Sequence, residues 1–167
     1  MTAAALAEEG LPEMARQGGR APVPSQADAS VETEPDHVAT SGQALKVLFV
    51  DDEEDFVRTM AERMEMRELG GDIALSGQEA LQMLEDDVPD VMVLDLRMPG
   101  IDGMEVLRRV KKTFPQIEVI IMTGHGSDKD EEEARRLGAF DYLRKPVDIE
   151  NLMGTVRNAG HARLKEE

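Results

Sequence analysis

Apolar residues fall into five short runs along the chain, and longer amphipathic stretches separate them. The runs are rich in β-branched residues and are short enough for buried strands. They are Lys46–Val50, Asp72–Leu75, Asp90–Asp95, Ile117–Met122 and Ala139–Leu143. This pattern predicts five strands.

The stretches between these runs carry apolar residues at helical spacing. Phe56, Met60 and Met64 repeat every four residues, which predicts an apolar helix face. Two later groups also follow helical spacing: Met104, Leu107, Val110 and Phe114, and Ile149, Leu152, Met153 and Val156. Strands that alternate with helices predict an α/β fold, in which a parallel sheet is covered on both faces and the crossovers are right-handed.

Four residues are placed where helices should begin or end. Ser, Thr, Asp and Asn are preferred at helix N-caps, and Gly is preferred at the position after a helix. Asp102 and Ser127 are the predicted N-caps, and Gly70 and Gly138 are the predicted stops.

Residues 1–44 have a different composition from the rest of the chain. They hold ten Ala, four Pro, four Gly and no aromatic residue, and their charge is two basic minus seven acidic, or −5. Such a segment has too little apolar surface to offset the entropy of ordering it. We therefore expect a disordered N-terminal tail over 1–44 and one folded domain over 45–165.

The composition excludes several classes of protein. With no Cys among 167 residues, the chain has neither a disulfide scaffold nor a cysteine nucleophile. Apolar runs such as Val119–Met122 are too short for a membrane span, and no secretory signal is visible. The net charge of −16 and pI of about 4.5 argue against direct binding to a nucleic-acid backbone. These features predict a cytoplasmic, acidic protein.

The residues that end the predicted strands carry the candidate chemistry. In open parallel sheets ligands bind at the carboxyl ends of the strands. Strand one ends in Asp51-Asp52-Glu53-Glu54-Asp55 and lacks the glycines of a phosphate-binding loop. Asp95, Thr123 and Lys145 end or follow three other strands. Each residue alone is compatible with a structural role, but together they predict a site.

Converging carboxylates need a counter-charge. Two of them about 5 Å apart repel by roughly 3 kcal/mol at an effective dielectric near 20. Mg²⁺ suits a site of a few carboxylates, phosphate and water. A carboxylate beside the metal and a lysine is a plausible nucleophile toward phosphorus, and its product is an aspartyl phosphate.

The segment from about Leu45 to Leu164 resembles a response-regulator receiver domain of two-component signalling. Four stretches carry the resemblance: Val50–Glu53, Val93–Gly103, Ile121–Gly124 and Leu137–Pro146. The steps of 43, 28 and 22 residues from Asp52 through Asp95 and Thr123 to Lys145 also fit the family. We expect a flavodoxin-like strand order of 2-1-3-4-5.

The resemblance implies a role for each residue of the site. Asp95 is the phosphoacceptor, and Asp51 and Asp52 bind Mg²⁺ together with Asp95 and the backbone carbonyl of Arg97. Lys145 pairs with the phosphoryl group and precedes a cis proline, Pro146. Thr123 and Tyr142 are the switch pair, whose hydroxyl swings to the phosphoryl group while the ring turns inward.

The resemblance also implies the partners. The donor is a phosphohistidine on a sensor kinase or phosphotransfer protein, and the domain also catalyses its own dephosphorylation. The face formed by the fourth helix, fifth strand and fifth helix changes on phosphorylation. Only one helix fits after Pro146, so we expect a stand-alone receiver whose output is a protein contact or a phosphoryl relay. The fourth helix carries many charges and few apolar residues, which predicts a loosely held helix.

Two alternatives stay open. Phosphatases of the haloacid dehalogenase type also use an Asp nucleophile with Mg²⁺, but they need a second Asp two residues later, where this chain has Arg97. A pseudo-receiver that is never phosphorylated is the other alternative, although all five key positions are intact.

Overall fold

The computed structural model describes residues 44–165. The predicted tail, apart from its last residue, lies outside the described residues. Across the described part of the chain, no helix combines the length and the apolar character needed to cross a membrane.

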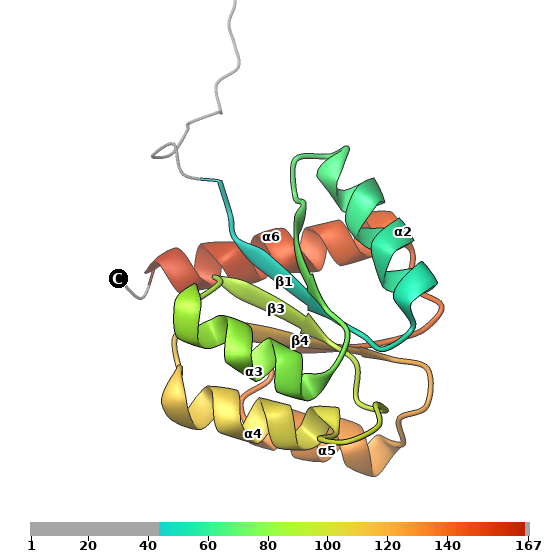
Figure 1. The fold of residues 1–167 in the computed structure, drawn as a ribbon, viewed down its shortest axis with the longest axis vertical. Helices are drawn as coiled ribbons and strands as arrows, with labels where there is room; N and C mark the ends of the chain where they lie inside the picture. Colours follow the sequence, from blue (N-terminus) through green and yellow to red (C-terminus); the bar gives the residue numbers. More distant parts are fainter. Residues whose placement is uncertain (1–43, 166–167) are drawn as a thin grey trace, which may run out of the picture. The chain divides into compact units, whose positions relative to one another are not determined.

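Five parallel strands form one sheet in the order β2-β1-β3-β4-β5 (Figure 1). The strands are β1 (Val47–Val50), β2 (Gly71–Ala74), β3 (Val91–Leu94), β4 (Glu118–Thr123) and β5 (Asp141–Arg144). The predicted fold class and strand order are therefore confirmed. The last strand starts later than predicted because the Ala139 N–H still bonds the Ala134 carbonyl at the end of the preceding helix.

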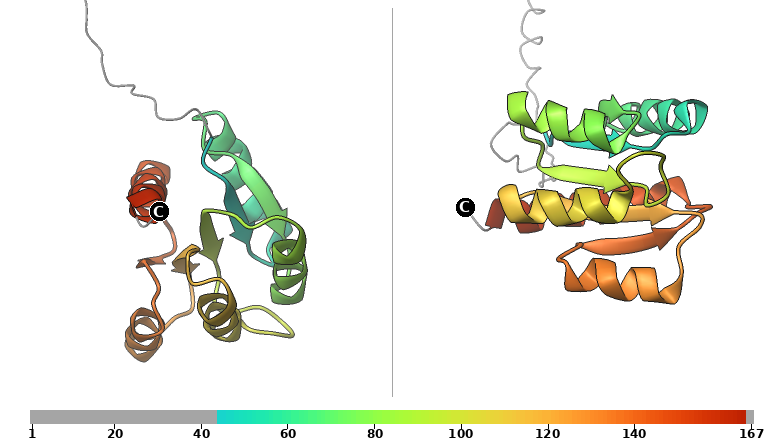
Figure 2. Two further views of the ribbon diagram at one scale, coloured as in Figure 1. Left: turned by 90° about the vertical axis from the view of Figure 1, so that its left-hand side faces the viewer. Right: turned by 60° about the horizontal axis from the view of Figure 1, so that its bottom comes forward.

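Helices cover both faces of the sheet (Figure 2). They are α2 (Glu54–Glu65), α3 (Gly77–Asp86), α4 (Gly103–Thr113), α5 (Asp128–Arg136) and α6 (Ile149–Lys165). Side chains alternate along a strand, so Val47 and Phe49 pack with α2 and α6, whereas Leu48 and Val50 pack with α3 and α4. The central strands β1 and β3 are buried along their whole length.

Most of the predicted helix ends are confirmed. Asp102 caps α4 by accepting from the Glu105 N–H, and Ser127 forms a capping box with Asp130 at the start of α5. Gly138 has a φ of +105°, and the backbone bonds Gly138 N–H to Arg135 O and Ala139 N–H to Ala134 O close the end of α5 as a Schellman motif.

The predicted stop at Gly70 is wrong, because α2 ends five residues earlier at Glu65. Glu68, with a φ of +66°, is the left-handed residue of the turn. The Leu69 N–H bonds back to the Met64 carbonyl at 2.8 Å, and this tight turn buries the Leu69 side chain. Burial of Leu69 thus sets the end of the helix.

Candidate functional site

The carboxyl edge of the sheet brings together the residues that follow β1 and β3. The backbone N–H of Asp51 donates to the Ala74 carbonyl, and that of Asp95 donates to the Val50 carbonyl. These bonds continue the sheet pairing for one residue, so both side chains project from the same edge. Asp51 is 1% exposed and Asp95 5%.

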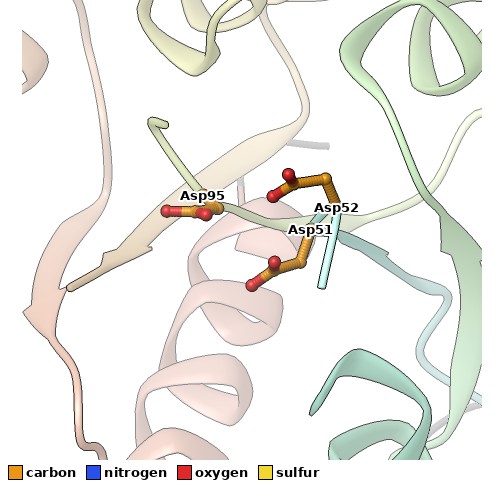
Figure 3. Close-up of side chains that lie close together, drawn as sticks. All are labelled: Asp51, Asp52 and Asp95. Atoms are coloured by element: carbon orange, nitrogen blue, oxygen red, sulfur yellow. The ribbon is translucent and has the colours of Figure 1, made fainter. Parts of the chain in front are cut away.

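Three carboxylates converge at this edge (Figure 3). One oxygen from each of Asp51, Asp52 and Asp95 lies within 4.8 Å of the others. Asp52 is exposed, whereas the Oδ1 atom of Asp95 is buried and has no hydrogen-bond partner in the described part of the chain. A buried, unpartnered anionic oxygen beside two further carboxylates fits a cation site.

Lys145 supplies positive charge to this cluster. Its Nζ lies 2.7 Å from Asp51 Oδ2, 3.3 Å from Glu53 Oε1 and 3.9 Å from Asp95 Oδ2. The peptide bond to Pro146 is cis, as the resemblance implies. Lys145 contributes the only cation that contacts Asp51 and Asp95 among the salt bridges of residues 44–165.

Burial and pairing act against each other on the ionisation of this pair. Burial raises the pKa of Asp51, although hydrogen bonds from Lys145 and from the Glu53 N–H oppose the rise. Burial alone would lower the pKa of Lys145, but the hydrogen bond to Asp51 and the charge of Asp95 raise it. Lys145 therefore stays protonated at neutral pH.

Thr123 and Tyr142 lie on the adjacent strands β4 and β5. Thr123 is buried, and its Oγ1 accepts a hydrogen bond from the His125 N–H at 3.2 Å. The Tyr142 ring is only 6% exposed, and its hydroxyl has no hydrogen bond within the described residues. Burial, followed by the charge of Asp130, raises the pKa of Tyr142.

Arg97 follows Asp95 by two residues, but its side chain points toward helix α5. The guanidinium bonds the His125 carbonyl at 3.3 Å and Asp130 Oδ2 at 3.4 Å. Asp130 is the capping-box residue of α5. The loop after β3 is thus linked to the start of α5.

Helix α5 buries little apolar surface and makes several ion pairs with other elements. Ala134 is the only residue of this helix that is buried. Three arginines from other elements bind its acidic side chains, namely Arg97 to Asp130, Arg108 to Glu133, and Arg144 to Asp128 and Glu131. The sequence pattern indicated a charged helix with little apolar packing, but it did not show the arginines that pair with it.

The predicted apolar face of α2 is wrong at Phe56. Met60 and Met64 are buried, but Phe56 is 37% exposed and Val57 occupies the core in its place. The Phe56 ring instead contacts Lys145, with Nζ 4.2 Å from the ring centroid. Sequence reasoning also missed Glu53 as a partner of Lys145; its position directly after the acidic pair was the available signal.

A doubly wound parallel sheet with a cluster of three carboxylates at its carboxyl edge defines the class of this protein, and comparison with known proteins gives the family. The sequence model of the response regulator receiver domain matches residues 47–157. The chain belongs to this family and is a receiver domain of a response regulator in two-component signalling. Phosphorylation on Asp is general to the family, and its members generally use Mg²⁺.

Individual relatives agree with this assignment. Over 93 residues the chain is 44% identical to the luminescence regulatory protein LuxO of Vibrio campbellii. This match covers 54% of this chain and 20% of LuxO. It is 43% identical over 84 residues to the DNA-binding transcriptional regulator NtrC of Escherichia coli, covering 50% of this chain and 18% of NtrC. The matched region spans about a fifth of the length of these curated relatives.

Among solved structures, a response regulator receiver domain protein from Clostridium thermocellum is similar to this chain. The two are 34% identical with a TM-score of 0.68, and the match covers 74% of this chain and 99% of the other.

Proposed function

We propose that Asp95 accepts a phosphoryl group from a phosphohistidine on a sensor kinase or phosphotransfer protein. One observation carries this proposal: the Asp95 carboxylate is buried, and it lies 3.9 Å from the Lys145 ammonium beside two further carboxylates. The Lys145 ammonium offsets part of the negative charge of this cluster, and the position of Asp95 directly after β3 places its carboxylate at the carboxyl edge of the sheet.

The transfer exchanges one bond for another. An oxygen of the Asp95 carboxylate attacks phosphorus, the bond from phosphorus to the histidine nitrogen breaks, and its electron pair remains on the imidazole. Lys145 pairs with the negative oxygens of the group in transit, and the Thr123 hydroxyl donates to one of them. The product is an aspartyl phosphate, which the domain itself hydrolyses with water.

The acidic cluster suits Mg²⁺. Asp51, Asp52 and Asp95 would hold the ion, and we assign the backbone carbonyl of Arg97 as a further ligand. The buried Asp95 Oδ1, which lacks a hydrogen-bond partner among the described residues, is the observation that supports this fit. Neutralisation of the carboxylates and of the phosphoryl oxygens is the chemistry that the metal supplies when bound.

The readout is a change on the face formed by α5, β5 and α6. Phosphorylation adds about −1.5 to −2 charges and three acceptor oxygens. Thr123 would turn toward the new oxygens, and Tyr142 on β5 would respond to the space that Thr123 leaves. The altered face then controls a protein partner or passes the phosphoryl group on. A net charge of −16 favours a protein over DNA as the surface that this domain contacts.

Intact mass after incubation with a small phosphodonor and Mg²⁺ tests the proposal. We expect one phosphoryl group on the natural chain, none without Mg²⁺ and none on Asp95→Asn. Asp72→Asn is the matched control, since Asp72 is exposed on β2, and it should be labelled like the natural chain.

Two results would overturn the proposal. If neither small donors nor a panel of phosphorylated sensor kinases labelled the chain, the domain would be a pseudo-receiver that acts by binding alone. Continuous turnover of a small phosphate ester would instead indicate a phosphatase with an Asp nucleophile.

A further inference from the structure

Lys145 is held by an aromatic ring as well as by carboxylates. Its Nζ lies 4.2 Å from the centroid of the Phe56 ring and 2.7 Å from Asp51 Oδ2. This is well within the roughly 6 Å over which a cation is attracted to the face of a ring. The Lys145 side chain is only 13% exposed, so water competes weakly with the contact.

Phe56 does not serve the core of the protein. It lies in the first turn of α2, and its side chain is 37% exposed, whereas the neighbouring Val57 is fully buried. The ring contact that the structure gives for Phe56 is the one with the Lys145 ammonium.

A competing group would otherwise draw Lys145 away from the site. Glu53 Oε1 lies 3.3 Å from Nζ, and the Glu53 side chain is 66% exposed. If the Lys145 ammonium stayed paired with Glu53 as the exposed Glu53 side chain moved, it would move toward water and away from Asp95. A ring stabilises the charge without offering an oxygen that competes with the phosphoryl group for the N–H donors.

We propose that Phe56 is a positioning residue for Lys145, holding the ammonium beside Asp51 and within reach of the group transferred to Asp95. The kinetic part of this inference rests on the proposed function of Lys145 and Asp95. The contact itself does not depend on phosphotransfer.

Three variants test the proposal. Phe56→Leu removes the ring, and Phe56→Tyr keeps it. Phe114→Leu is the matched control, because Phe114 is a partly buried ring that packs on the other face of the sheet. The first measurement is the NMR shift of the Lys145 ε-methylene protons, which lie close enough to the Phe56 ring to be moved upfield by its ring current. The second is the rate of phosphorylation by a small phosphodonor at saturating Mg²⁺. A small donor is used because a protein donor could itself contact Phe56, and the loss of that contact would also change the rate.

We expect the upfield shift in the natural chain, in Phe56→Tyr and in Phe114→Leu. In Phe56→Leu the signal should join those of exposed lysines such as Lys112, and the rate should fall by about two- to fivefold. Phe56→Tyr should restore the rate. An unchanged shift or an unchanged rate in Phe56→Leu would overturn the proposal.

The two measurements separate this inference from the proposed function. If the natural chain took no phosphoryl group, the proposed function and the kinetic part would fail together. The ring-current shift would still decide whether Phe56 holds Lys145.

Discussion

Replacing Gly126 with alanine is expected to move the Tyr142 ring out of its buried position. An alanine Cβ at this position would lie 1.7 Å from the Tyr142 hydroxyl oxygen and 3.0 Å from both Tyr142 Cζ and Thr123 Cγ2. The φ of Gly126 is outside the left-handed region, so the backbone itself accepts alanine. Gly126 is therefore needed for the space that it leaves, and that space is filled by the Tyr142 hydroxyl.

The size of the overlap decides which group moves. Non-bonded heavy atoms settle about 3.5 Å apart, so the hydroxyl must retreat by about 1.8 Å. Keeping the ring buried against an added methyl group would cost about 1–3 kcal/mol. Turning it outward gives up part of its burial, but it also returns to water a hydroxyl that has no hydrogen bond in the described structure, and this recovers about 1–3 kcal/mol. Full burial of a large apolar side chain is worth about 1.5–3 kcal/mol, so the partial loss of burial is largely offset by the hydroxyl, and the outward ring is favoured.

The phenol absorbance of Tyr142 is a clean assay for this movement. The chain has one Tyr and no Trp, so an absorbance titration reports this residue alone. Burial and the charge of Asp130 raise the pKa of Tyr142 above its ordinary value of 10.0, and the pKa of the Gly126→Ala variant should fall toward that value.

The same shift predicts a change in alkaline stability. The unfolded phenol ionises near its ordinary pKa of 10.0, whereas the folded one keeps its proton to higher pH. The natural chain therefore loses stability as pH rises from 10.0 through the raised pKa, and Gly126→Ala should lose less over this range.

Gly124→Ala is the matched control on the same loop. Its Cβ would make only ordinary contacts with Lys145, at 3.7 and 3.8 Å, so its phenol should titrate as in the natural chain. If Gly126→Ala stayed folded and its Tyr142 phenol titrated as in the natural chain and in Gly124→Ala, the Tyr142 hydroxyl would not depend on the space beside Gly126.

Three further predictions address the acidic cluster, helix α5 and the core. Mg²⁺ at about ten times its Kd should stabilise the natural chain by about 1.4 kcal/mol in thermal unfolding, and an equal gain in Asp51→Asn would contradict the assigned site. Salt near 1 M shortens the Debye length to about 3 Å and should speed amide exchange in α5 more than in α4, since ion pairs such as Arg144–Glu131 are screened; equal protection in both helices would show that packing holds α5. Phe49→Ala should lower the free energy of unfolding in denaturant by about 3–5 kcal/mol, because Phe49 is fully buried, and a loss under about 1 kcal/mol would contradict its place in the core.

Local patterns were sufficient for the five strands and for most helix ends, whereas the order of the strands in the sheet was expected from the resemblance to receiver domains. Short apolar runs identify buried strands because a central parallel strand is covered on both faces. The caps at Asp102 and Ser127 depend on hydrogen bonds that span three residues, so the sequence carries them directly. Residues that end parallel strands lie at one edge, and the candidate site at Asp51 and Asp95 could therefore be predicted before any contact was known.

Contacts between distant segments were decided only by the tertiary structure. Lys145 meets Asp51 across 94 residues, and no local period encodes that Phe56 turns to this lysine while Val57 takes its place in the core. The end of α2 at Glu65 depends on the burial of Leu69, which requires the assembled sheet.

The same holds for α5 and for the glycines. The acidic residues of α5 are visible in the sequence, but their arginine partners come from the loop after β3, from α4 and from β5. The sequence shows Gly126 only as a loop glycine, whereas the structure shows that the Tyr142 hydroxyl occupies the space that a side chain at this position would need. Thus the chain by itself determined the order of elements, their caps and the edge that carries the site, because these follow from backbone periods and neighbouring residues. The tertiary structure decided which side chains pack around the site at that edge, because these side chains come from segments that are far apart in sequence.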